Sequence, residues 1–160
     1  MIDRICDLHC DTLYEARKNN DSIIDRCGHL TIKQLSEYKS FIQVMAMWSD
    51  KKLSPDEAFD AYIEASVILD RDMFLSARSG YSVKKVTCGK HIVDNEESGV
   101  SSVVFAVEGG ALLGEDLSRV KQLWLNDVRL LTLVWSGVNA IGGAHDTDIG
   151  LTEFGKAVVN

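Results

Sequence analysis

The sequence has little proline, few cysteines and no excess of positive charge, and each shortage excludes a class of protein. Its 160 residues include one proline and neither repeats nor low-complexity tracts, so nothing marks a linker between domains. Lysine and arginine number 17 against 24 acidic residues, and the formal net charge of -7 argues against a nucleic-acid partner. No apolar run approaches the roughly 20 residues that span a bilayer. We expect one domain over residues 1–160 that binds neither nucleic acid nor membrane.

Four cysteines are present, and their spacing matches neither a zinc finger nor a CxxC motif. Cys6 and Cys10 lie about 13 Å apart along one predicted strand, which is too far for a disulfide. That strand follows the first residues directly and leaves no room for a secretory signal. We therefore expect reduced thiols at Cys6, Cys10, Cys27 and Cys88, and a cytoplasmic protein.

Apolar runs alternate with amphipathic segments along the chain. This alternation predicts an α/β protein with a parallel sheet. The clearest helix start is Ser54-Pro55-Asp56-Glu57, which has the pattern of a capping box with proline in the first turn. We predict strands at 5–11, 41–48, 102–107 and 128–135, and helices at 12–18, 31–38, 55–75, around 91–97, at 117–125 and from 152.

The first strand ends in polar residues that can bind a metal ion. Simple alternation places Asp7, His9 and Asp11 on one face and Leu8 and Cys10 on the other. An imidazole and a carboxylate two residues apart on one face can reach a single ion. The alternative is an ordinary strand end with polar groups at the surface.

Glu108 is the second strong signal, because it ends a buried-type strand and is followed by Gly109 and Gly110. A glutamate there can bridge two metals, act as a general base or cap the next segment. The carboxyl ends of parallel strands share one edge of a sheet, so His9 and Asp11 are expected nearby. Imidazole with carboxylates suits zinc or another divalent first-row ion, and three protein ligands leave positions open for water.

Five segments together resemble the N-terminal half of the membrane (renal-type) dipeptidases, the zinc dipeptidases of peptidase family M19. They occur in the family's order from one end of the chain to the other. The segments are Asp-Leu-His-Cys-Asp at 7–11, Gln-Val-Met-Ala-Met-Trp at 43–48, Val-Glu-Gly-Gly at 107–110, Val-Arg-Leu-Leu-Thr-Leu at 128–133 and Gly-Leu-Thr-Glu-Phe-Gly-Lys-Ala-Val-Val at 150–159.

The resemblance implies a (β/α)8 TIM barrel of the amidohydrolase type, present here as an N-terminal half-barrel. It also implies a binuclear zinc site whose metal-bound hydroxide attacks the amide of a dipeptide. His9 and Asp11 would bind one zinc ion. Glu108 would bridge both ions and take part in catalysis. Asp7 would not touch the metal but would orient one of its ligands.

Two features depart from the family. Trp135 stands where the family usually has a histidine that contacts the substrate, and we expect it to form a wall of the substrate pocket. The family is also about twice as long, and the remaining metal ligands and the arginine for the substrate carboxylate are expected beyond Asn160. The chain alone is then a fragment of doubtful activity, which would need a complementing C-terminal half or a second copy.

Two other functions stay open at this stage. One is a related amidohydrolase that acts on another small amide, which Trp135 would favour. The other is a non-catalytic remnant that binds a partner or self-associates.

Overall fold

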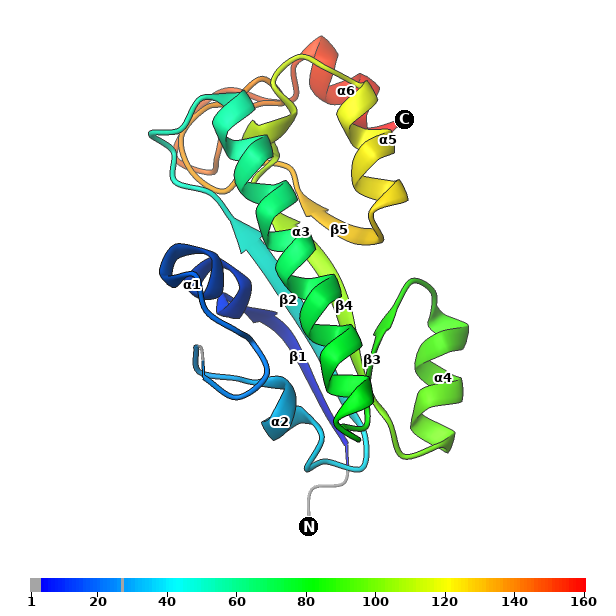
Figure 1. The fold of residues 1–160 in the computed structure, drawn as a ribbon. Coiled ribbons are helices and arrows are strands. Elements are labelled where there is room, and N and C mark those ends of the chain that lie inside the picture. Colours follow the sequence, from blue (N-terminus) through cyan, green and yellow to red (C-terminus); the bar gives the residue numbers. More distant parts are fainter. Residues whose placement is uncertain (1–3, 27) are drawn as a thin grey trace.

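The computed structural model describes residues 4–26 and 28–160, and its centre is one sheet of parallel strands (Figure 1). The strands are β1 (Ile5–Cys10), β2 (Phe41–Trp48), β3 (Val83–Val86), β4 (Ser101–Glu108) and β5 (Val128–Thr132). The helices are α1 (Thr12–Asn19), α2 (Ile32–Leu35), α3 (Pro55–Arg78), α4 (Gly89–Glu97), the 3-10 turn η1 (Gly110–Leu113), α5 (Ser118–Leu125) and α6 (Glu153–Val159). The predicted α/β class with a parallel sheet is confirmed.

The strand order is β1-β2-β4, and both β3 and β5 pair with β4. Because β2 follows one edge of β4 from Ser102 to Glu108, β3 and β5 must share its other edge. β3 pairs with the first half of β4, up to Val104, and β5 pairs with the second half, from Phe105. The carboxyl ends of β1, β2, β4 and β5 therefore meet at one rim, which is where the predicted ligands lie.

Two strand predictions need correction. β3 was not predicted, because its sequence Val-Lys-Lys-Val is short and half polar and lies in a segment that looked irregular. β5 ends at Thr132 and does not reach Trp135. Beyond Thr132 the backbone carbonyl of Leu133 accepts the N–H of Gly110, so this stretch packs on the turn after β4.

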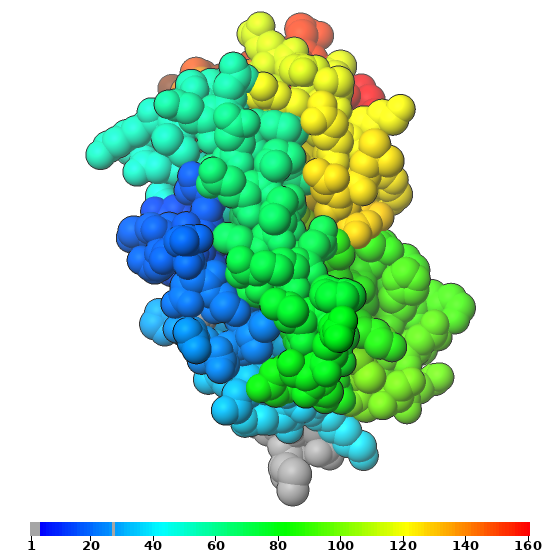
Figure 2. Space-filling model, in the orientation of Figure 1, coloured from blue at the N-terminus to red at the C-terminus, as the bar shows by residue number. Residues whose placement is uncertain are grey.

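The main core lies between the sheet and the helices. Alternate residues of the central strands face opposite sides, so Met45 and Met47 belong to the main core while Val44 and Ala46 belong to a small cluster on the other face. On the helix side, the fully buried Tyr62 of α3 stacks on Phe105 at a centroid distance of 5.8 Å. Figure 2 shows α3 packed between the N-terminal elements and the segments that follow it.

The predicted start of α3 is confirmed in detail. The Ser54 hydroxyl accepts the N–H of Glu57, and the Glu57 carboxylate accepts the N–H of Ser54. Pro55 occupies the first turn, where a missing N–H costs nothing. This helix runs to Arg78, three residues beyond the predicted end.

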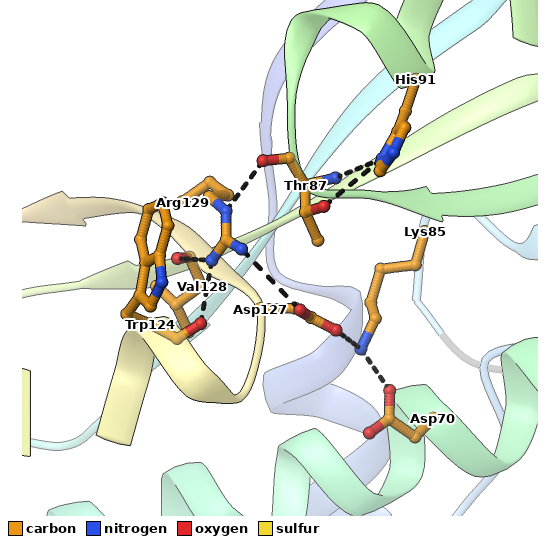
Figure 3. Close-up of polar contacts among 8 residues, drawn as sticks. All are labelled: Asp70, Lys85, Thr87, His91, Trp124, Asp127, Val128 and Arg129. Atoms are coloured by element: carbon orange, nitrogen blue, oxygen red, sulfur yellow. Dashed lines mark hydrogen bonds and ion pairs between the residues drawn. The ribbon is translucent and has the colours of Figure 1, made fainter. Parts of the chain in front are cut away.

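Ion pairs and hydrogen bonds of polar side chains connect β3 to the start of β5, where the two strands pair with the same edge of β4 (Figure 3). Lys85 of β3 lies 2.5 Å from a carboxylate oxygen of Asp70 in α3 and 2.9 Å from one of Asp127. The Arg129 guanidinium of β5 donates to the backbone carbonyl of Thr87, just after β3, at 2.8 Å. These contacts explain how a four-residue strand is held at an edge that β5 continues.

Of the four cysteines, Cys6, Cys10 and Cys88 form no disulfide in the part of the chain that the structure describes. Cys27 lies outside the described residues. Across residues 4–26 and 28–160, no helix combines the length and the apolar character that a membrane crossing needs.

Candidate metal centre

β1 delivers two of the three predicted ligands. His9 lies near the end of the strand, and Asp11 is the residue that precedes helix α1. Asp11 makes no side-chain capping bond to that helix, so its carboxylate is available to the rim. Its Oδ1 lies 3.3 Å from Nε2 of His9.

A β-bulge changes the side-chain alternation that the sequence predicted for β1. Asp7 pairs with Gln43 and Cys10 pairs with Met45, so three steps along β1 match two along β2. Partners in a parallel pair share a face, and Asp7 and Cys10 therefore lie on the same side of the sheet. The prediction that put them on opposite faces was wrong. The Asp7 carboxylate accepts the backbone N–H of His9 at 3.0 Å, which fixes the backbone behind the imidazole.

β4 supplies Glu108 at the same rim. In the sheet register Glu108 lies beside Trp48 of β2 and Thr132 of β5, at the last position of each strand. Its Oε2 lies 3.5 Å from Nε2 of His9. The structure thus brings His9, Asp11 and Glu108 together, with one donor atom from each within 4.8 Å of the others.

The two glycines after Glu108 are required for different reasons, a backbone angle at the first and a close contact at the second. Gly109 has φ of +87°, which disfavours any residue with a side chain. At Gly110 a Cβ would overlap Cδ1 of Ile141 and lie 3.0 Å from the Leu133 carbonyl oxygen, so a side chain there would force the neighbouring loop to shift. Together they permit the turn that presents Glu108 to the rim.

The electrostatics of this cluster favour a cation. Burial raises the pKa of Glu108, the charge of His9 lowers it, and the charge of Asp11 raises it again. The Glu108 side chain is 20% exposed, against 45% for His9 and 57% for Asp11, so the cluster opens to solvent at one side. A cation between the carboxylates would offset both their desolvation and their mutual repulsion.

The distances also suit a first-row divalent ion. In a tetrahedral site with bonds of about 2.1 Å, neighbouring ligand atoms lie about 3.4 Å apart. The separations of 3.3 Å and 3.5 Å from Nε2 of His9 are close to that value, and the donors of Asp11 and Glu108 lie within 4.8 Å of each other. Among the described residues no other group of three histidine, cysteine, aspartate or glutamate side chains comes together in this way.

Aromatic rings border the cluster, and sequence reasoning found only one of them. Trp135, predicted as a pocket wall, lies 5.2 Å from Trp48 between ring centroids, and Trp48 lies 4.9 Å from Tyr14. A hollow of about 420 Å³ is lined by these three rings together with His9, Asp11, Glu15 and Glu108. Tyr14 and Trp48 could have been noticed, because one follows Asp11 by three residues on a helix and the other ends a predicted rim strand.

The sequence of the chain matches a known protein family. The family model described as "Membrane dipeptidase (Peptidase family M19)" matches residues 3–160. No curated protein matches the chain.

Solved structures show the same fold. The dipeptidase AC, a metallopeptidase of family M19, has a TM-score of 0.78 at 20% identity, over 98% of this chain and 52% of its own. A metallopeptidase from Rhodobacter sphaeroides, bound to a phosphinate mimic of L-Ala-D-Ala, has a TM-score of 0.71 at 20% identity, over 98% and 54%. An amidohydrolase from Pseudomonas aeruginosa has a TM-score of 0.63 at 12% identity, and the match covers 98% of this chain and 40% of the amidohydrolase chain.

The chain thus spans about half the length of the M19 structures that it matches. This coverage, with β1, β2, β4 and β5 side by side in one parallel sheet, confirms the predicted fold, a half-barrel of the TIM-barrel type.

Proposed function

The chain belongs to the membrane dipeptidase family, peptidase family M19, and from this premise we propose that it forms the metal-binding first half of a zinc-dependent dipeptidase. The family supports a metal-dependent peptidase in general terms. The observation that carries the finer proposal is the meeting of His9, Asp11 and Glu108 at the carboxyl ends of β1 and β4.

In the proposed site His9 and Asp11 would hold one zinc ion, and Glu108 would contribute to that ion and to a second one. Zinc in such a site polarises a carbonyl oxygen and lowers the pKa of a bound water to near neutrality. Asp7 orients the backbone of His9 through the hydrogen bond to its N–H. The bulge in β1 keeps the Cys10 side chain with the core, so a thiolate does not compete for the metal.

The protein's own side chains also shape the substrate site. Glu108 is the most enclosed of the three donors, and the Trp48–Trp135 pair lies beside it. A dipeptide amide placed over the donors would have one side against these rings, which exclude water from that side. A cytoplasmic location belongs to the same proposal, and the three free thiols agree with it.

The proposal is tested with the purified protein in its complete form, by metal analysis and by hydrolysis of dipeptides. We expect zinc in the protein and amide cleavage that stops on chelation. His9→Ala and Asp11→Ala should lower zinc content, and Glu108→Gln should lower kcat by at least about a hundredfold, the scale expected for a group acting at the reacting centre. Glu97→Gln is the matched control, since Glu97 is an exposed acid on α4.

The outcomes separate the candidate functions. Zinc binding with cleavage of another small amide, but not of dipeptides, would favour the related amidohydrolase. A folded protein with neither zinc nor amide cleavage would contradict the proposal and favour the non-catalytic remnant.

A further inference from the structure

Three aromatic rings form a continuous row beside the proposed zinc site. Tyr14 comes from α1, Trp48 from the end of β2, and Trp135 from the segment after β5. Both contacts in the row are edge-to-face, at interplanar angles of 63° and 67°. Centroid distances of this size are typical of attractive aromatic pairs. We call Tyr14, Trp48 and Trp135 the aromatic row.

The aromatic row and the metal-binding residues line the same hollow. Its volume of about 420 Å³ is in the range of small-molecule sites. The donors of His9, Asp11 and Glu108 and the three rings line it together. A ligand whose reacting amide lies over the donors would place an adjoining side chain against the rings.

The lining of the hollow favours one kind of side chain. Among the described residues that line it there is no lysine or arginine, and its acids are Asp11, Glu15 and Glu108, so an acidic side chain would meet like charge. The aromatic row supplies ring surface for apolar contact. An aromatic or large aliphatic side chain makes the most contact with that surface.

The backbone beneath Trp135 holds the row in place. A Cβ built on Gly109 would lie 3.5 Å from Cβ of Trp135, so the tryptophan packs directly over the glycine turn. That turn is tied to the end of β5 by the N–H of Gly109 on the Thr132 carbonyl, at 3.1 Å, and by the next N–H on the Leu133 carbonyl, at 3.0 Å. Trp135 is still 48% exposed, which leaves surface for a ligand to cover. A wall fixed before binding loses little entropy when a ligand arrives.

From this arrangement we propose that the aromatic row is a specificity-determining wall, centred on Trp135, that selects dipeptides with an aromatic or large aliphatic side chain beside the scissile amide. The inference rests on the proposed dipeptidase function. Trp135 acts by contact with the substrate side chain.

The test compares Phe-Gly and Gly-Phe with Gly-Gly in the complete protein. We expect KM for one of the two phenylalanine dipeptides to be at least about tenfold below that for Gly-Gly, which corresponds to burying part of one aromatic ring. Trp135→Ala should bring the ratio of the two KM values about tenfold closer to one. Trp135→Phe should keep part of the preference for the phenylalanine dipeptide. Trp124→Phe is the matched control, because Trp124 is also an exposed tryptophan, at 61%, and it stacks on Arg129 from α5 without lining the hollow.

A binding measurement separates failure of this inference from failure of the proposed function. In the Trp124→Phe protein the part of the tryptophan fluorescence that Trp135→Ala removes reports on the wall, and the preferred phenylalanine dipeptide should quench it at lower concentration than Gly-Gly. Quenching of this kind without any hydrolysis would support the wall and contradict the dipeptidase. Hydrolysis of all three dipeptides with equal KM, unchanged in Trp135→Ala, would overturn the wall and leave the dipeptidase standing.

Discussion

At the scale of single residues, Gly109 and Gly110, which follow Glu108, determine the backbone turn that positions it at the rim. The left-handed φ of Gly109 turns the chain, and Gly110 lets the loop that carries Ile141 pack onto it. The carbonyl of Leu133, 3.0 Å from the position of a Cβ at Gly110, is backbone and cannot swing aside as a side chain can. The position of Glu108 therefore depends on a residue that takes no part in metal binding.

We predict that Gly110→Ala destabilises the protein by about 1–3 kcal/mol, the usual range for overpacking. Gly89→Ala is the control, because a Cβ there meets nothing within 4 Å at the start of α4. The control should be neutral or stabilise by up to about 1 kcal/mol, as alanine is the better helix former. Urea unfolding midpoints measure both changes, and equal effects of the two substitutions would contradict the steric account.

At the scale of elements, α3 shows how a local signal places a long helix. Its capping box satisfies N–H groups that have no partner within the helix, and the acids Asp56 and Glu57 lie in the first turn, where the helix dipole favours negative charge. Because α3 packs on β2, β3 and η1, its start determines which residues reach the core.

We predict that Ser54→Ala lowers the free energy of unfolding by about 1 kcal/mol, the usual cost of losing an N-cap. Glu57→Gln keeps an acceptor for the Ser54 N–H and should cost less. A chevron or urea titration of both variants gives the comparison, and a larger loss in Glu57→Gln than in Ser54→Ala would contradict it.

The contribution of the Ser54–Glu57 capping box to stability should depend on pH. Hydrogen bonds from the N–H and hydroxyl of Ser54 lower the pKa of Glu57 below its ordinary value of 4.5. A carboxyl whose pKa is lower in the folded state stabilises the fold above the unfolded-state pKa and loses this effect as pH falls through the folded-state pKa. The stability difference between the protein and Glu57→Gln should therefore shrink below about pH 4.5.

At the scale of the whole molecule, the sheet is open. Of the strands that the structure describes, β1 pairs only with β2, and β5 pairs only with β4. Leu8 of β1 is 72% exposed and Leu130 of β5 is 49% exposed, so apolar surface accompanies both edges. Open edges of this kind invite pairing with further strands. A complementing C-terminal half or a second copy stays a prediction, as do the single-domain limits.

We predict that zinc stabilises the protein as a whole, because it would bind the folded arrangement of His9, Asp11 and Glu108 and not the unfolded chain. At a free zinc concentration a hundred times the dissociation constant, the free energy of unfolding should rise by about 2.7 kcal/mol. Thermal unfolding with added zinc and then with a chelator measures this gain and its loss. His9→Ala should remove most of the gain, and an equal gain in that variant would show that zinc binds elsewhere.

Local features determined much of the structure from the sequence alone. The alternation of apolar runs and amphipathic helices, the Ser54 cap, and the Glu-Gly-Gly turn after a buried strand each depend on residues close together in the chain. Their outcome can therefore be worked out without knowing the rest of the fold. The family resemblance rested on the same short segments, and it was confirmed.

Only the tertiary structure decided the features that depend on distant parts of the chain. β3 exists as a strand because half of one edge of β4 is not paired with β5, and because Lys85 pairs with Asp70 of α3 and with Asp127, the residue before β5. The bulge that moves Cys10 to the core arises from pairing with β2. The row from Tyr14 to Trp135 draws on three segments. Such contacts follow from how elements pack, and nothing in the neighbouring sequence encodes that packing.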